Sequence, residues 1–160
     1  EKSDGAGVFL KRFSEYSLVD VKEFAKYRIY FAAPLFSEGE RSFNRHAADI
    51  LEELYFHVHL PQELDDDEEA RGENREAAIY AGNLAALKEA DIVVGVIDGA
   101  DADSGTAWEM GYATASGKRV IALRTDFRRL SENESVNLML EMDADVVHSL
   151  DELRELLTYY

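Results

Sequence analysis

The chain has 160 residues, no cysteine and a formal net charge of −16 at pH 7. At this length one domain is expected, and without cysteine neither a disulfide nor thiolate chemistry is available. The acid excess argues against the basic face that nucleic-acid binding needs. The apolar runs are far shorter than the roughly 20 residues of a membrane helix. We therefore expect a cytoplasmic protein that binds neither nucleic acid nor a membrane.

Apolar and amphipathic stretches alternate along the chain after residue 27. We expect residues 1–27 to form an N-terminal arm and residues 28–160 to form one domain. The alternation predicts strands at 28–35, 56–61, 91–98, 118–124 and 145–150, and helices at 37–56, 74–90 and 151–160, with a further helix starting within 101–113. Two other segments are expected to be a polar loop, 62–73, and a loop with a short helix, 126–143.

Strands that alternate with helices predict an α/β fold. We expect a single flavodoxin-like or Rossmann-like domain, in which a five-stranded parallel sheet of order 2-1-3-4-5 carries helices on both faces. Ligands of such sheets bind outside the carboxyl ends of the strands, near the point where the strand order reverses. The candidate site therefore includes residues 32–36, after the first strand, and 98–106, after the third.

The segment DADSGTAWEMGYA, residues 101–113, lies at this expected site and allows two interpretations. In the first, Thr106 and Glu109 form a capping box that satisfies free backbone N–H groups at a helix start. In the second, Glu109 is a functional carboxylate. A second carboxylate, Asp103, precedes it across a short loop, and Gly105 leaves room for a substrate to approach the backbone.

A metal site is a third interpretation, built from Asp98, Asp101, Asp103 and Glu109. A calcium loop starting at Asp98 fails, because its third and fifth positions are alanines and its sixth is aspartate where glycine is required. A loosely held magnesium ion remains open. The four histidines, His46, His57, His59 and His148, match no metal-ligand motif. We expect neither a metal nor a cofactor.

Two carboxylates in a dry crevice suit the cleavage of a glycosidic bond. One ionised carboxylate attacks the anomeric carbon, and the other donates a proton to the leaving group. A carboxylate at a helix N-terminus is kept ionised by the helix dipole and free N–H groups. We therefore expect Glu109 to be the nucleophile and Asp103 to be the acid and base.

Three segments resemble a known family. They are RIYFAAPLF at 28–36, the block from Asn83 to Leu123, and DFRRLSENESVNLML at 126–140. Over about residues 28–157 the sequence resembles the nucleoside 2-deoxyribosyltransferase family. The resemblance implies that a glutamate attacks C1′ of a 2′-deoxynucleoside, the base leaves, and a second base takes the sugar with retained configuration. The substrates would then be deoxynucleosides and free nucleobases.

The resemblance also implies roles for individual residues. Asp103 and Glu109 match the paired carboxylates, and Tyr30 matches a tyrosine that orients the nucleophile. Further substrate-binding residues would be Phe36, Asn83, Gly105, Asn137 and Met139. Many members have aspartate where this chain has Asn83, and an amide can hold a substrate but cannot carry a proton. A surface position in mid-helix is the other interpretation of Asn83.

The late segment implies an oligomer. In the family this segment reaches the active site of a neighbouring subunit, where its asparagine, here Asn137, holds the 5′-hydroxyl of the sugar. We therefore expect a dimer-based homo-oligomer, such as a dimer, tetramer or hexamer, with shared active sites. The alternative places the apolar cluster around Met139 in the core of its own domain.

Three other functions remain open. A hydrolase of deoxynucleoside 5′-monophosphates has a similar fold, but the segment AAPLFSEGE, residues 32–40, carries two acids that would repel phosphate. Phosphoribohydrolases share the pattern GTAWE at 105–109, but their Pro-Gly-Gly turn is absent. A nucleotide-sensing module without catalysis is the third.

Overall fold

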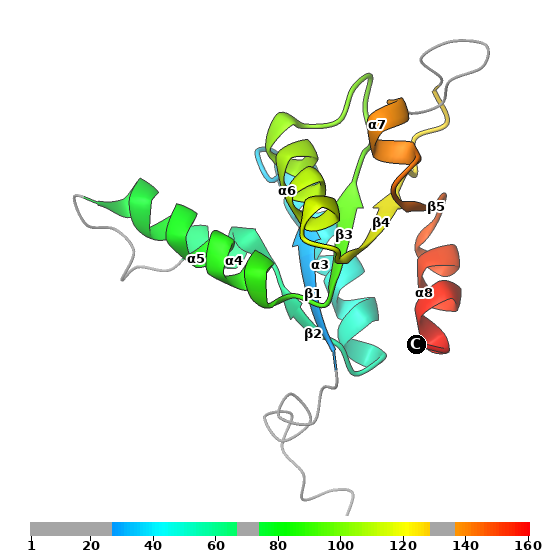
Figure 1. Ribbon diagram of the computed structural model, residues 1–160, viewed down its shortest axis with the longest axis horizontal. Helices are drawn as coiled ribbons and strands as arrows, with labels where there is room; N and C mark the ends of the chain where they lie inside the picture. The colour runs from blue at the N-terminus through cyan, green and yellow to red at the C-terminus, as the bar shows by residue number, and fades with distance from the viewer. Residues whose placement is uncertain (1–26, 67–73, 129–136) are drawn as a thin grey trace, which may run out of the picture.

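The computed structural model describes residues 27–66, 74–128 and 137–160, so the arm expected at 1–27 lies outside the described residues except for Tyr27 (Figure 1). Within these ranges, five parallel strands form one sheet in the order β2-β1-β3-β4-β5. The strands are β1 (Arg28–Ala32), β2 (His57–His59), β3 (Ile92–Val96), β4 (Arg119–Leu123) and β5 (Asp145–Val147). The predicted α/β fold and strand order are confirmed.

Helices cover both faces of the sheet (Figure 1). They are α3 (Glu38–Glu53), α4 (Pro61–Asp66), α5 (Arg75–Glu89), α6 (Ser104–Ala115), α7 (Leu138–Glu141) and α8 (Leu150–Thr158). Helices α3 and α8 pack on one face, and α5 and α6 pack on the other. Among the helices of the described ranges, none has the length and apolar character needed to span a bilayer.

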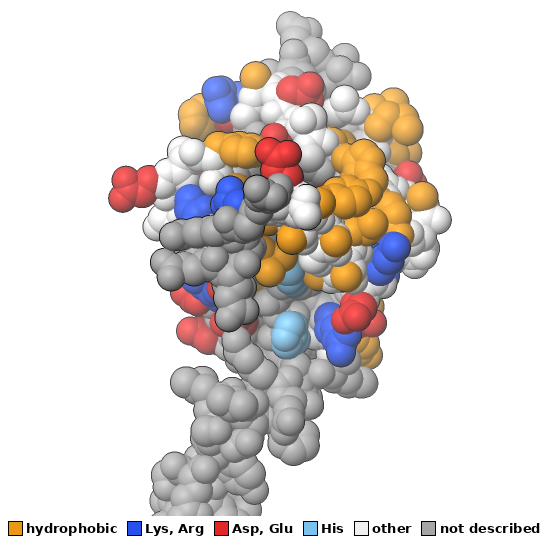
Figure 2. Space-filling model, turned by 90° about the vertical axis from the view of Figure 1, so that its left-hand side faces the viewer, with side chains coloured by type: hydrophobic (Ala, Val, Ile, Leu, Met, Phe, Trp, Pro, Cys, Tyr) orange, Lys and Arg blue, Asp and Glu red, His pale blue; other side chains and the backbone are white. Residues whose placement is uncertain are grey.

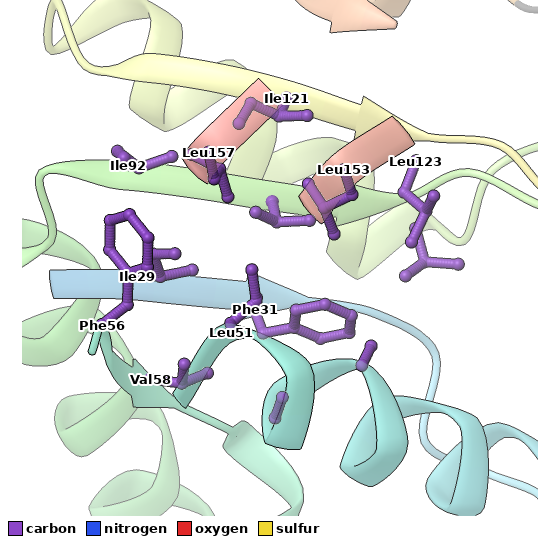
Figure 3. Close-up of a cluster of buried hydrophobic side chains, with 14 of the residues drawn as sticks. Ile29, Phe31, Leu51, Phe56, Val58, Ile92, Ile121, Leu123, Leu153 and Leu157 are labelled. Atoms are coloured by element: carbon purple, nitrogen blue, oxygen red, sulfur yellow. The ribbon is translucent and has the colours of Figure 1, made fainter. Parts of the chain in front are cut away.

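Alternation along β1 divides its side chains between the two cores. Ile29 and Phe31 point toward α3 and α8, where they pack with Leu51 and Leu153 (Figure 3). Tyr30, between them, points to the opposite face and joins the core under α5 and α6. This alternation places the Tyr30 side chain beneath the helix that carries Glu109.

The central strand β3 is buried along its whole length. Its neighbours β1 and β4 pair with it on both edges, and both faces are covered, which explains why its sequence IVVGV is apolar throughout. At Gly95 the strand makes close contact with α6, because a Cβ there would lie 2.4 Å from Met110 Sδ. The glycine thus sets how closely α6 approaches the sheet.

Most predicted boundaries differ from the observed ones by one to three residues, and three of the differences have a clear physical reason. Strand β1 ends at Ala32 rather than at residue 35, because Pro34 has no N–H for the ladder. Strand β5 ends at Val147, since the Ser149 hydroxyl accepts a hydrogen bond from a backbone N–H of α8 and starts that helix. The loop predicted over 62–73 begins as helix α4, whose first residue, Pro61, occupies a position that proline favours.

Candidate active site

Glu109 faces β1 from the second turn of α6. Its Oε1 accepts a hydrogen bond from the Tyr30 hydroxyl over 2.5 Å. The two residues are 79 positions apart in the sequence, and they meet because Tyr30 points to the sheet face that α6 covers. Tyr30 is fully buried and Glu109 is half-buried. The hydrogen bond therefore orients the carboxylate where it still has access to solvent.

Asp103, rather than Thr106, caps the start of α6. Asp103 Oδ2 accepts a hydrogen bond from the Thr106 backbone N–H at 3.0 Å and from the Thr106 hydroxyl at 3.3 Å. The capping-box interpretation of Thr106 and Glu109 is therefore wrong. Contrary to expectation, the helix N-terminus also does not keep Glu109 ionised, because the dipole acts within the first turn and Glu109 lies in the second.

Burial raises the pKa of Glu109 above its ordinary value. The hydrogen bond from Tyr30 opposes that rise, whereas the negative charge of Asp103 adds to it. The pKa of Tyr30 is itself strongly raised, first by burial and then by the charge of Glu109, so its hydroxyl stays protonated and remains a donor. The Tyr30 hydroxyl is thus the group that favours the ionised form of Glu109.

A hollow of about 160 Å³ opens in front of the Glu109 carboxylate. Its lining residues are Tyr30, Tyr80, Asn83, Leu84, Leu87, Gly105, Trp108 and Glu109. Figure 2 looks onto the side of the molecule that carries α5 and shows apolar side chains gathered there. The volume is below the roughly 300–1,000 Å³ of pockets that enclose a drug-sized ligand. A hollow of this size would enclose only part of a small organic molecule.

Four predicted site residues line this hollow, namely Tyr30, Asn83, Gly105 and Glu109. Asp103 adjoins it, because a Cβ on Gly105 would lie 3.1 Å from Asp103 Oδ2. Gly105 thus lies between the hollow that Glu109 lines and the Asp103 carboxylate. The geometry thus brings together an oriented carboxylate, a second carboxylate, an amide and open space.

The other three predicted residues lie elsewhere. Phe36 is 80% exposed on the loop after β1 and does not line the hollow. Asn137 and Met139 line a second hollow of about 570 Å³ between α6 and α7, on another face of α6. Within its own chain the Asn137 side chain caps α7 by accepting a hydrogen bond from the Met139 N–H at 3.0 Å.

Three residues near the carboxylate were missed by the sequence analysis. Tyr80 and Trp108 line the hollow while remaining 60% and 52% exposed. His59 lies behind it, with its ring stacked on Tyr30. Tyr80 stands three positions before Asn83 in a helix, so the shared face was a usable signal. The position of His59 next to Tyr30 depends on strand pairing, which no local sequence pattern predicts.

Asp98 serves to connect loops at the carboxyl edge of the sheet. Its carboxylate accepts hydrogen bonds from the N–H and hydroxyl of Thr125 and from the N–H of Asp126, at 2.5 to 2.9 Å. These bonds fix the segment after β3 against the segment after β4. In the part of the chain that the structure describes, no three histidine, aspartate or glutamate side chains gather in a way that could hold a metal ion.

Comparison with known proteins assigns the chain to a family. The model of the family described as nucleoside 2-deoxyribosyltransferase matches residues 29–142. A nucleoside deoxyribosyltransferase of Lactobacillus johnsonii is 36% identical over 93 residues, which are 58% of this chain and 56% of that protein. The match therefore spans about half the length of this curated relative.

Solved structures share the fold. A conserved protein of Enterococcus faecalis has a TM-score of 0.69 at 27% identity, over 83% of this chain and 98% of that one. A 2-deoxyribosyltransferase of Bacillus psychrosaccharolyticus has a TM-score of 0.68 at 26% identity, over 79% and 90%. A Leishmania mexicana protein has a TM-score of 0.67 at 21% identity, over 84% and 99%, a likeness of fold alone. Because the family model matches well over half of its residues, this chain belongs to the nucleoside 2-deoxyribosyltransferase family.

Proposed function

We propose that the protein transfers 2-deoxyribose from one nucleobase to another. The observation that carries the proposal is the Glu109 carboxylate, which is oriented by Tyr30 in an open hollow beside a second carboxylate, Asp103. Family membership and the activities named for the relatives from L. johnsonii and B. psychrosaccharolyticus support the same reaction. The cytoplasmic location expected from the composition is part of this proposal.

The proposed reaction has two displacement steps. In the first, Glu109 attacks C1′ through Oε2, the bond from C1′ to the base nitrogen breaks, and Asp103 gives a proton to the departing base. In the second, a nitrogen of the incoming base attacks C1′, the ester to Glu109 breaks, and Asp103 takes the proton of that base. Two inversions at C1′ give retention of configuration.

Glu40 favours free nucleosides over nucleoside monophosphates. Backbone N–H groups at a helix start are a natural phosphate site. Here the Glu40 carboxylate already accepts hydrogen bonds from the N–H groups of Phe36, at 2.9 Å, and Ser37, at 2.7 Å. A phosphate at this place would have to displace a carboxylate of the same charge sign. The monophosphate hydrolase is therefore the second candidate.

Incubation with deoxyinosine and adenine separates the candidates. We expect deoxyadenosine and hypoxanthine in equal amounts. Free deoxyribose without deoxyadenosine would instead identify a hydrolase, and deoxyinosine monophosphate in a parallel reaction would show whether a phosphate is needed. A protein that binds deoxyinosine and leaves it intact would be a binding module.

The acid limb of the pH–rate profile should move in opposite directions in two variants. Activity needs ionised Glu109, so it is lost as pH falls through the pKa of that residue. Tyr30→Phe removes the hydrogen bond that lowers this pKa and should shift the limb to higher pH. Asp103→Asn removes a charge that raises it and should shift the limb to lower pH. The measurement is the pre-steady-state release of a good leaving base, and equal shifts in one direction would contradict this account.

We further propose that a second subunit completes the site in a symmetric dimer, from which a tetramer or hexamer can be built. The side chains of Leu138, Met139 and Met142 are 57%, 78% and 73% exposed, and they lie at or next to α7 beside the larger hollow. Contiguous exposed apolar surface of this kind is typical of a protein interface. The smaller hollow at Glu109, about 160 Å³ in volume, would also leave part of a nucleoside uncovered, as is expected of a shared site.

Mixing two inactive variants should restore activity if sites are shared. We expect Glu109→Ala and Asn137→Ala to be nearly inactive as homo-oligomers. In exchanged dimers, one site carries both defects and the other carries none, so activity should recover toward one intact site per dimer. Subunit exchange is verified by mass spectrometry of differently tagged chains. Proven exchange without recovery, or a fully active monomer, would contradict the shared site.

A further inference from the structure

His59 lies directly behind the candidate site. In the parallel pairing of β1 and β2 it is the partner of Tyr30, and paired residues of neighbouring strands point to the same face of a sheet. The two rings stack with centroids 5.2 Å apart and planes 20° from parallel. This stacking fixes the plane of the half-buried imidazole and therefore the direction of its Nε2 atom.

That Nε2 atom lies 3.1 Å from Oδ1 of Asn83 on α5. Asn83 lines the hollow in front of Glu109, whereas His59 does not. An amide has one acceptor oxygen and one nitrogen with two N–H donors. If the imidazole donates to Oδ1, the Nδ2 donors of Asn83 are left to face a ligand. The contact with His59 is made by Oδ1, and within the described residues Nδ2 has no hydrogen-bond partner.

We propose that His59 is a positioning residue that holds the Asn83 amide with its NH₂ group toward the nucleobase. The inference rests on the proposed transfer reaction and names its base preference. Hypoxanthine and uracil carry a carbonyl oxygen, O6 or O4, at the position that would face the amide, and this oxygen accepts the hydrogen bond. Adenine and cytosine carry an amino group, N6 or N4, at the same position, so a donor meets a donor and both groups are left unsatisfied. The reverse pairing, in which Nδ2 donates to His59, would turn the amide oxygen to the base and reverse this preference.

The test measures kcat and KM for hypoxanthine against adenine, and for uracil against cytosine, with thymidine as the common sugar donor. His59→Phe keeps a ring on Tyr30 but removes the N–H donor, and it should reduce the preference for carbonyl bases about three- to tenfold, mainly through KM. His59→Gln keeps an N–H donor and should retain the preference. His57→Phe, an exposed position on the same strand, is the matched control and should behave as wild type.

Asn83→Asp gives an independent readout, because it replaces the donor by an acceptor of the same shape. The preference should then shift toward amino bases. A wild type that prefers amino bases, a His59→Phe protein with unchanged preference, or an Asn83→Asp protein that slows all bases equally would overturn the proposal. If His59→Phe fails to fold, as judged by circular dichroism, the base preferences of His59→Gln and Asn83→Asp test the proposal instead. Absence of transfer by wild type with every base contradicts the proposed function itself.

Discussion

Replacing Glu109 with glutamine should lower the transfer rate by about four orders of magnitude or more. Glutamine has nearly the same shape and still accepts a hydrogen bond from Tyr30, but its amide does not form the ester with C1′. The loss should appear in the first half-reaction, measured as release of base in a single turnover. A variant that retains more than about one hundredth of the wild-type rate would show that another group attacks the sugar.

The same substitution should not destabilise the fold at neutral pH. Burial raises the pKa of Glu109 above its unfolded value, so between these two values the native state binds more protons than the unfolded state. The contribution of Glu109 to the free energy of unfolding therefore falls as pH rises through that window. Glutamine does not titrate, so the variant does not undergo this fall. We expect Tm of Glu109→Gln to equal or exceed that of wild type at pH 7, with the difference shrinking toward pH 4. A helix cap would instead cost about 1 kcal/mol when removed.

Gly95→Val should produce the largest loss of stability, about 3 kcal/mol in the free energy of unfolding. A Cβ at Gly95 would lie 2.4 Å from Sδ and 2.7 Å from Cγ of Met110, so the side chain or α6 itself must move. Because Glu109 adjoins Met110 in the sequence, movement of α6 also displaces the carboxylate from Tyr30. We therefore expect reduced transfer together with a lower urea midpoint.

Two variants control the experiment on Gly95. Gly39→Ala lies on the exposed start of α3, where a Cβ meets nothing within 4 Å, and should be neutral or stabilising by up to about 1 kcal/mol. Met110→Ala in the Gly95→Val background should restore part of the lost stability, since the clash is with that side chain. Additive losses in the double variant would mean that Gly95 matters for another reason.

The sheet order followed from the sequence because parallel strands and their helices leave strong periodic signals. The continuous apolar run over β3 and the helical spacing in α3 are local patterns, and both elements form where expected. The start of α4 differs from the prediction because a proline after an apolar run indicates the end of a strand, whereas Pro61 begins a helix, whose first turn proline also favours.

The site was less predictable, because its contacts join distant segments. Asp103 and Glu109 were identified as a pair, but the sequence could not show that Asp103 caps the helix while Tyr30 holds Glu109. Similarly, the contact of His59 with Asn83 depends on how β2 and α5 pack. Strand register and helix packing decide such contacts, and neither has a local sequence pattern.

The most direct test of the central claim is to trap the sugar on the protein. A nucleoside with fluorine at C2′ of the deoxy sugar destabilises the electron-poor transition state at C1′, so a covalent intermediate should accumulate. Peptide mass spectrometry should find one fluorinated sugar on Glu109, the adduct should disappear when a free base is added, and Glu109→Gln should carry none. An adduct on another residue, or efficient transfer to a base without any adduct, would contradict the assignment of Glu109 as the nucleophile.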